Sequence, residues 1–270
     1  MGAMRFSTIG YENRYNPALN IAGTDAFIQS LTVGMPPAPD HFARCSDINR
    51  QGPALVRTLP VLKVLTPAQF HAEMQRDDTI VVDIRSYTAF GGQHIPGSYH
   101  IDISGNFPTN AGWVLPPEKD ILLVTEIPVE AREAREAVTY LRRVGLDRAI
   151  GYLEGGTHAW VSAGYETDTV PQLSPEKVHA KLQEEGTVLV DVRAADEYNI
   201  QHIPEAVNIL TMDLRTRAAE LDPARPTIVM CGSGIRSSLA SSLLKQQGFT
   251  DVSNAAGGMR GYIAAGFFPA

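Results

Sequence analysis

Cysteine is scarce in this chain of 270 residues, which contains only Cys45 and Cys231. Two cysteines do not make the disulfide framework of a small secreted domain, so a reducing cytoplasm is the expected compartment. The chain also lacks a run of about 18 apolar residues, which a membrane span would need. Its first residues lack the charged start and apolar centre of a signal peptide. We therefore expect a cytoplasmic protein without a membrane partner.

Basic runs are absent as well. The 23 Lys and Arg residues stand against 30 Asp and Glu, which gives a net charge of −7. This balance excludes nonspecific nucleic-acid binding as the expected function. The hydrophobic content of 44% and the charged content of 20% are those of an ordinary globular protein, and the length favours two domains.

One pattern occurs twice in the chain. The first copy starts at Thr79 and reads TIVVDIRSYTAFGGQHIPGSYHI; the second starts at Thr187 and reads TVLVDVRAADEYNIQHIPEAVNI. An offset of 108 relates these stretches, whereas an offset of 102 relates Gly155-Gly156 to Gly257-Gly258. The first copy therefore has about six extra residues, which we expect near 105–117. A repeat longer than about 20–50 residues predicts two domains rather than a solenoid.

Each copy opens with a helix signal, Thr66-Pro67 in the first and Ser174-Pro175 in the second. Short apolar strands then alternate with helical stretches. Alternating strands and helices predict an α/β fold, a parallel sheet with helices on both faces. Ligands of such sheets bind beyond the carboxyl ends of the strands.

The stretch 227–247 combines a strand, a loop and a helix. Residues 227–230 are predicted to form a buried strand, and 236–247 an amphipathic helix that ends before Gly248. Between them stands CGSGIR, which begins at Cys231. Its glycines allow an anion-binding nest of amides, and the helix start and Arg236 add positive potential that favours a thiolate. Most free cysteines are buried and inert, but this loop favours a reactive Cys231. Cys45 is interpreted as a packing residue.

The first copy lacks this loop. Thr125 stands where Cys231 stands, and Glu126-Ile127-Pro128-Val129-Glu130 follows, with two acids and no glycine. The carboxylates would repel an anion, and Thr125 has no evident base, so we expect a structural role for this copy. Because the first copy keeps the counterparts of Asp191, Arg193 and His202, these three residues are also interpreted as structural.

Both copies, some 200 residues, resemble the rhodanese homology domain, with a catalytically inactive first copy and an active second copy. The motifs that carry the resemblance are Asp191-Val192-Arg193, His202-Ile203-Pro204, CGSGIRS from Cys231, and Gly257-Gly258. Family members usually have glycine where Gln201 and Glu205 stand. The resemblance implies a sulfurtransferase in which Cys231 carries a persulfide. The residues that it implies as substrate-binding are Gly232, Ser233, Gly234, Ile235, Arg236 and Ser237.

The loop length bears on the chemistry. Four residues separate Cys231 from Arg236, one fewer than in the Cys-x5-Arg loop of cysteine phosphatases, and by resemblance the shorter loop indicates sulfur transfer. The expected partners are a small-molecule donor, thiosulfate or a low-molecular-weight persulfide, and a thiol, sulfite or cyanide acceptor. A Cys-dependent phosphatase or arsenate reductase, and a non-catalytic interaction module, remain alternatives.

The N-terminal segment resembles another family. Ile9-Gly10-Tyr11-Glu12, Asn16-Pro17-Ala18-Leu19 and Asn49-Arg50-Gln51-Gly52-Pro53 resemble the C-terminal tail of metallo-β-lactamase-fold enzymes, in particular the persulfide dioxygenases fused to rhodanese domains. The resemblance implies a dioxygenase domain in cis that this sequence lacks. No His-x-His spacing of that family is present, so we expect no metal and no other cofactor.

The expected organisation has three parts. Residues 1–62 form the tail and linker, with helices over 24–33 and 39–48; residues 63–168 form the inactive rhodanese-like domain; residues 169–270 form the active one.

Overall fold

The computed structural model of the chain describes residues 6–35, 38–126 and 131–268. The chain separates into two units, Met1–Pro39 and Asp40–Ala270. The first contains α1 (Ile9–Tyr15), the 3-10 helix η1 (Pro17–Asn20) and α2 (Thr24–Thr32). The helix expected over 24–33 is confirmed, but α1 and η1 were not predicted. Side-chain caps start both, from Thr8 Oγ1 and Asn16 Oδ1. None of these three helices has a buried residue.

The second unit begins with α3 (His41–Gln51) and the 3-10 helix η2 (Val56–Thr58). The helix expected over 39–48 therefore exists, but it starts and ends two to three residues later. Its Arg44 side chain donates hydrogen bonds to the carbonyl oxygens of Val144, at 2.8 Å, and Gly112, at 3.2 Å. α3 thus packs against the first copy of the repeat.

The first copy forms a five-stranded parallel sheet in the order β1-β5-β4-β2-β3. A capping box between Thr66 and Gln69 starts its first helix, as the Thr66-Pro67 signal predicted. Its elements are β1 (Lys63–Leu65), α4 (Pro67–Met74), β2 (Thr79–Asp83), α5 (Tyr87–Gly92), β3 (Tyr99–His100), α6 (Phe107–Val114), β4 (Asp120–Val124), α7 (Arg132–Arg143), β5 (Ala149–Leu153) and α8 (Gly156–Ser162).

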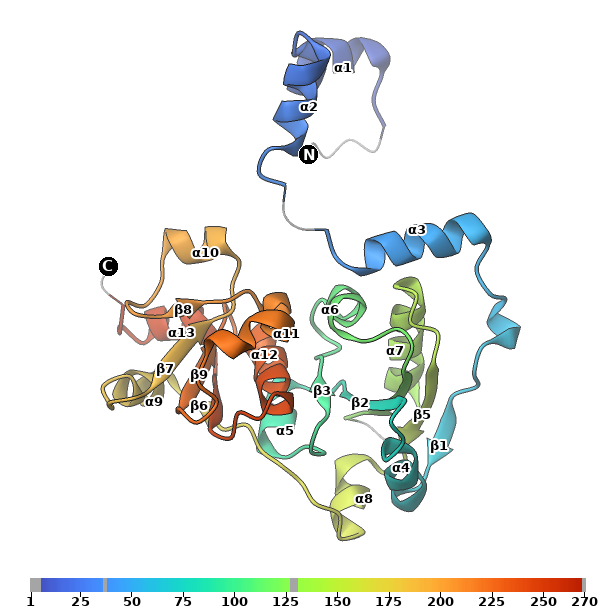
Figure 1. The fold of residues 1–270 in the computed structure, drawn as a ribbon, viewed down its shortest axis with the longest axis vertical. Helices are drawn as coiled ribbons and strands as arrows, with labels where there is room; N and C mark the ends of the chain where they lie inside the picture. The colour runs from blue at the N-terminus through green and yellow to red at the C-terminus, as the bar shows by residue number, and fades with distance from the viewer. Residues whose placement is uncertain (1–5, 36–37, 127–130, 269–270) are drawn as a thin grey trace. The chain divides into compact units, whose positions relative to one another are not determined.

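The second copy repeats this topology, with the strand order β6-β10-β9-β7-β8 and parallel pairing throughout. Ser174 caps its first helix, as predicted. Its elements are β6 (Gln172–Leu173), α9 (Pro175–Lys181), β7 (Val188–Asp191), α10 (Ala195–Ile200), β8 (Val207–Asn208), η3 (Thr211–Asp213), α11 (Leu214–Arg217), η4 (Ala218–Glu220), β9 (Thr227–Met230), α12 (Ile235–Gln246), β10 (Val252–Ala255) and α13 (Gly258–Ala264). The predicted α/β fold with two tandem parallel sheets is confirmed (Figure 1).

Alternate residues of the central strands enter different cores, as expected for strands buried on both faces. In β4, Leu122 and Val124 pack in a core that belongs to the first copy alone. Leu123, on the opposite face, joins a core that continues into the second copy and includes Val190 and Cys231. The two copies therefore share one of their hydrophobic cores.

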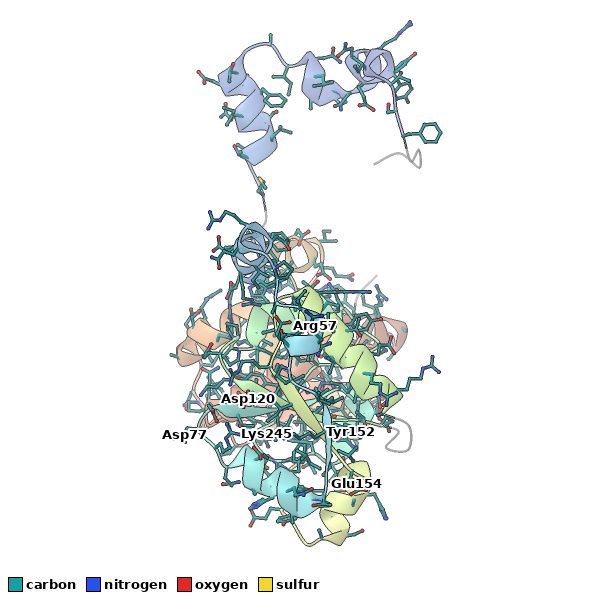
Figure 2. The ribbon with its side chains drawn as sticks, turned by 90° about the vertical axis from the view of Figure 1, so that its right-hand side faces the viewer. Arg57, Asp77, Asp120, Tyr152, Glu154 and Lys245 are labelled. Carbon is teal, nitrogen blue, oxygen red and sulfur yellow. The ribbon has the colours of Figure 1, made fainter. Side chains whose placement is uncertain are left out.

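Helix α12 is buried between the two copies. The sequence predicted an amphipathic helix here, and this was wrong: every residue from Ser237 to Leu244 is buried, because the first copy covers the face that would otherwise meet solvent. The amide of His100, in edge strand β3, donates to Oγ of Ser242 at 3.0 Å. Lys245, labelled in Figure 2, pairs with Asp168 of the connecting segment at 2.8 Å.

The extra residues of the first copy lie only partly in the region near 105–117 where we expected them. From the last residue of β3 to the last residue of β4, the first copy has two more residues than the second copy has from β8 to β9. A register shift in the β4–β5 pairing at Ile121/Leu122 accounts for one more. The other three lengthen the connection from β4 to α7, which has seven residues (125–131) against four (231–234) between β9 and α12. The largest insertion thus replaces the loop that holds Cys231 in the second copy.

Candidate functional site

Cys231 directly follows β9, the middle strand of its sheet, and lies at the carboxyl edge where the sequence placed a ligand site. The loop Cys231–Gly234 is held from the opposite side by α13. The amide of Met259 donates to the carbonyl oxygen of Cys231 at 2.7 Å, and the amide of Arg260 donates to that of Gly232 at 3.3 Å. The carbonyl groups of Cys231 and Gly232 are therefore occupied by amides at the N-terminus of α13.

Gly258 makes this contact possible. Its φ is +57°, and a Cβ there would lie 2.3 Å from the carbonyl oxygen of Cys231 and 2.6 Å from the amide nitrogen of Ser233. Only glycine combines this backbone conformation with so close an approach. The Gly257-Gly258 pair of the sequence pattern is thus a packing requirement of the cysteine loop.

Two donors converge on the sulfur of Cys231. The amide of Gly234 lies 3.1 Å from Sγ and the hydroxyl of Ser237 lies 3.3 Å from it. Gly234 has φ +100° and precedes the first turn of α12. Ser237 does not cap the helix; its hydroxyl faces the sulfur. Of the six residues predicted to bind substrate, these two contact the thiol.

The other four, Gly232, Ser233, Ile235 and Arg236, form the remainder of the turn. Within the described part of the chain, their amide groups and that of Ser237 have no hydrogen-bond acceptor. Unpartnered amides at a helix start suit an anion. The side chain of Cys231 itself is fully buried, with 0% of its surface exposed. A reagent therefore reaches the sulfur only after some of the residues that bury it move.

Arg236 is already engaged. Its Nη1 lies 2.6 Å from Oε2 of Glu197 and its Nη2 lies 2.9 Å from Oε1, a bidentate pair. These hydrogen bonds lower the pKa of Glu197 and raise the pKa of Arg236. Sequence reasoning missed Glu197, because no spacing rule links residues 39 positions apart.

The first copy forms one wall of the site. A Cβ on Gly234 would lie 3.3 Å from ring atoms of Tyr87, and one on Gly105 would lie 3.3 Å from Ile235. Tyr87 is held at the start of α5, where its amide donates to Asp102 at 3.3 Å. This contact was not predicted, since single-copy reasoning does not show which surfaces of the two domains meet.

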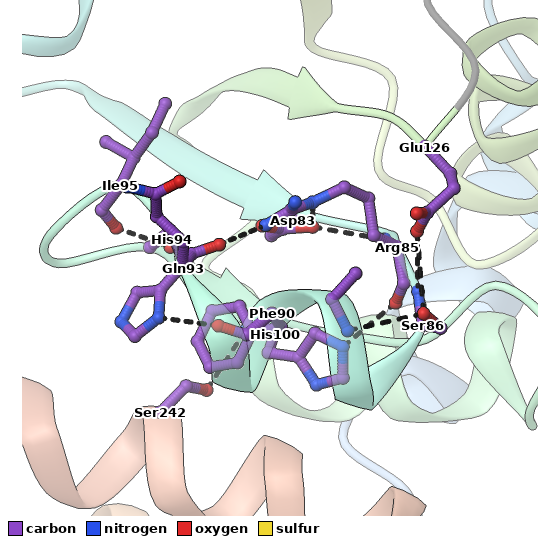
Figure 3. Close-up of polar contacts among 12 residues, drawn as sticks. Asp83, Arg85, Ser86, Phe90, Gln93, His94, Ile95, His100, Glu126 and Ser242 are labelled. Carbon is purple, nitrogen blue, oxygen red and sulfur yellow. Dashed lines mark hydrogen bonds and ion pairs between the residues drawn. The ribbon is translucent and has the colours of Figure 1, made fainter. Parts of the chain in front are cut away.

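The Asp-x-Arg motif is structural in both copies. In the second, Arg193 pairs with Asp191 at 2.6 Å and donates to the carbonyl oxygen of Gln201 at 2.7 Å. Figure 3 shows the same arrangement in the first copy, where Arg85 pairs with Asp83 at the same 2.6 Å. The motif ties the strand end to the next loop, in agreement with the sequence interpretation.

His202 is placed in the same structural way. Its Nδ1 donates to the carbonyl oxygen of Tyr198 at 2.9 Å, and its ring stacks on Tyr198 with 3.9 Å between centroids. His94 makes the equivalent contacts with Phe90 in the copy without cysteine. A contact kept in both copies supports the structural interpretation of His202.

The pairing register confirms the equivalence of Thr125 and Cys231, because Val124 faces Asp83 as Met230 faces Asp191. Thr125 is buried, and its hydroxyl has no partner within the described residues. Glu126 accepts a hydrogen bond from the amide of Ser86 at 3.4 Å. The expectation for Ile127, Pro128, Val129 and Glu130 concerns residues outside the described ranges.

Cys45 lies on α3, half-buried, with Sγ 3.9 Å from the carbonyl oxygen of Arg143. Among the described residues, no three His, Cys, Asp or Glu side chains are grouped so that they could hold a metal ion. In the same ranges, none of the helices has the length and apolar character that crossing a bilayer requires.

The fold and the site together define a tandem α/β protein in which one of two similar domains carries a cysteine at the carboxyl end of its central strand. The chain belongs to the rhodanese-like domain family, whose model matches residues 66–163 and 174–265.

Relatives of known name match parts of the chain. The putative sulfur carrier protein YrkF of Bacillus subtilis is 35% identical over 108 residues, which are 40% of this chain and 56% of that protein. The thiosulfate sulfurtransferase GlpE of Pseudomonas savastanoi pv. phaseolicola is 38% identical over 87 residues, 32% of this chain and 81% of that protein. The chain thus spans little more than half of the first relative.

A solved structure of a metallo-β-lactamase from Staphylococcus aureus is also similar. It is 27% identical, with a TM-score of 0.45, and the match covers 57% of this chain and 42% of that one.

Proposed function

We propose that the chain is a sulfurtransferase that moves sulfane sulfur from thiosulfate or a low-molecular-weight persulfide to a thiol, sulfite or cyanide. Cys231 carries the sulfur as a persulfide. Membership of the rhodanese-like family and the likeness to a named thiosulfate sulfurtransferase support this class of activity.

The proposed reaction has two half-reactions at one sulfur. The Cys231 thiol gives its proton to solvent, and the thiolate attacks the outer sulfur of the donor. A new S–S bond forms on Sγ, while the S–S bond of the donor breaks and sulfite or a thiolate leaves with its electron pair. The acceptor then attacks the terminal sulfur of the persulfide, takes it up and regenerates the Cys231 thiolate. Because both half-reactions use one site, ping-pong kinetics follow.

The observation that carries the proposal is the convergence of the Gly234 amide and the Ser237 hydroxyl on Sγ, at 3.1 and 3.3 Å. Hydrogen bonds to an ionised group are roughly twice as strong as those between neutral groups. This pair therefore stabilises a thiolate, and the unpartnered amides of the same turn are available to the terminal sulfur of a persulfide.

The short loop argues against the phosphatase alternative. Only four residues separate the end of β9 from the start of α12. A phosphoryl group would need more room in the loop than this spacing gives. The full burial of Cys231 suits the non-catalytic module better than the enzyme, so access to the sulfur is what the experiment must test.

Mass spectrometry after incubation with thiosulfate or glutathione persulfide tests the function. The measurement uses the Cys45→Ser protein, in which Cys231 is the remaining thiol, and compares it with the same protein carrying Cys231→Ser. We expect one added sulfur atom on the first and none on the second, with release of thiocyanate on adding cyanide. No adduct from either donor would indicate the interaction module, and turnover of an aryl phosphate without an adduct would indicate the phosphatase.

We also propose that the first unit packs on a persulfide dioxygenase domain in cis. The support is that its described helices bury none of their own residues, which leaves apolar side chains such as Phe6, Ile9 and Val33 exposed. Titrating a separately expressed dioxygenase domain of such a fusion against this chain tests the idea. We expect this chain to bind the domain and a variant with charged residues at these three positions to lose the binding. Equal binding by the two proteins would contradict the proposal.

A further inference from the structure

The ion pair between Glu197 and Arg236 lies beside the cysteine loop. Arg236 is the second residue of α12, and its guanidinium folds back so that a Cβ on Gly232 would lie 3.2 Å from Nη2. Glu197 is in the first turn of α10, close after the Asp191–Arg193 pair that fixes the end of β7. The two side chains are 36% and 40% exposed, whereas Cys231, at the start of the same loop, is fully buried.

The repeat provides an internal comparison. The offset of 108 places Ala89 at the position of Glu197, and the equal lengths of α7 and α12 place Glu133 at that of Arg236. The copy without cysteine therefore lacks both partners of this pair, although it keeps the Asp83–Arg85 pair in the same geometry as its counterpart. The Glu197–Arg236 pair thus occurs with the cysteine, whereas the contacts that both copies need for folding occur in both.

We propose that Glu197 is a latch on the candidate site. It holds the Arg236 guanidinium over the loop, and an anionic sulfur donor opens the site when its sulfonate or carboxylate takes the place of the Glu197 carboxylate on Arg236. The identity of the donor rests on the proposed function; the latch itself does not. Glu197 acts through Arg236 and is therefore a positioning residue.

The geometry suits exchange. The bidentate contact shows that the planar fork of Arg236 accepts two oxygens of one group, and solvent already reaches both side chains. A pair this exposed favours the closed state by a factor of only about two to five. The latch therefore excludes water and stray reagents for most of the time, yet yields to a substrate anion.

Alkylation of Cys231 tests the latch without any sulfur donor. The protein is Cys45→Ser, the variant is Glu197→Gln in that background, and the probes are iodoacetamide, which is neutral, and iodoacetate, which is anionic. We expect Glu197→Gln to raise the iodoacetamide rate about two- to five-fold and the iodoacetate rate by more, because the freed Arg236 attracts the carboxylate. Asp196→Asn is the matched control, since it removes a neighbouring exposed charge outside the pair; its rates should stay close to those of the parent.

Salt provides a second measurement, whose main observation is made on the parent protein. Raising ionic strength screens an exposed pair, so alkylation of the parent by iodoacetamide should accelerate while that of Glu197→Gln should not. Equal alkylation rates in the parent and Glu197→Gln, or a rate for Asp196→Asn as high as that of Glu197→Gln, would overturn the latch. No alkylation of any variant would also overturn it, since the cover would then not open. Persulfide formation is scored separately, so either proposal can fail alone.

Discussion

The hydroxyl of Ser237 lies 3.3 Å from Sγ of Cys231, and both side chains are fully buried. The next residue, Ser238, is equally buried, but its hydroxyl has no partner within the described residues. The hydroxyl groups of two adjacent buried serines thus differ in whether a sulfur lies within hydrogen-bond reach.

Ser237→Ala should therefore slow sulfur transfer while Ser238→Ala leaves it nearly unchanged. A hydrogen bond to an ionised group contributes about 1.5–3 kcal/mol. Because the Gly234 amide still stabilises the thiolate in this variant, we expect kcat/KM with thiosulfate and cyanide to fall roughly ten-fold. Steady-state kinetics of both variants provide the measurement. Equal effects of the two substitutions would show that the Ser237 hydroxyl does not act on the sulfur.

Gly258→Ala should disable the loop through its backbone. The added Cβ would meet the carbonyl oxygen of Cys231 at 2.3 Å and would require φ +57° of an alanine. We expect loss of sulfur transfer and a decrease in the free energy of unfolding of about 3 kcal/mol or more. Gly248→Ala is the control, because Gly248 has φ +89° with nothing near its Cβ position; it should lose about 1 kcal/mol and remain active. Denaturant titration and activity assays distinguish the two.

Local signals in the sequence were sufficient to predict the repeat, the parallel sheets and the strand that precedes Cys231. The β-branched run 227–230 acts over a few residues, so it predicted β9 correctly and with it the position of Cys231 at the carboxyl end of that strand. Contacts between distant segments had no such signal. Glu197 meets Arg236 across 39 positions, and Tyr87 reaches Gly234 from the other copy. The burial of α12 was mispredicted for the same reason, because the surface that covers it belongs to the first domain.

Stability should depend on pH through two buried histidines of the first copy. Burial lowers the pKa of His94 and of His100, and Phe90 lies stacked against both rings. The charges that face them, chiefly Asp83 and Asp168, only partly oppose this effect. Because the folded-state pKa values lie below the unfolded value of about 6.5, the unfolded chain binds more protons. Stability is then complete above that pH and falls as the pH drops below it.

The loss for each of these histidines between about pH 7.5 and about pH 5.5 is at most about 1.4 kcal/mol, the limit for a group that stays unprotonated in the folded state. Urea unfolding at the two pH values measures it. His94→Gln should remove roughly half of the difference, whereas His158→Gln, at an exposed position of α8, should leave it unchanged. An undiminished difference in His94→Gln would assign the pH dependence to other groups.

Restoring a thiol to the first copy should not restore chemistry. Thr125→Cys in a Cys231→Ser background places sulfur at the equivalent strand end, but the connection that follows has seven residues rather than four. Its helix starts after Ala131, with φ +50°, where the second copy has Gly234, and Glu126 brings a carboxylate next to the thiol. The acidic residues Glu126 and Glu130 and the absence of glycine from this connection disfavour an anion-binding nest of amides, so we expect no persulfide after incubation with thiosulfate. The same substitution combined with replacement of 126–131 by GSG, which also shortens the connection to four residues, is the informative comparison. An adduct on the shortened loop alone would show that loop geometry decides activity, and an adduct on Thr125→Cys alone would show that the cysteine suffices.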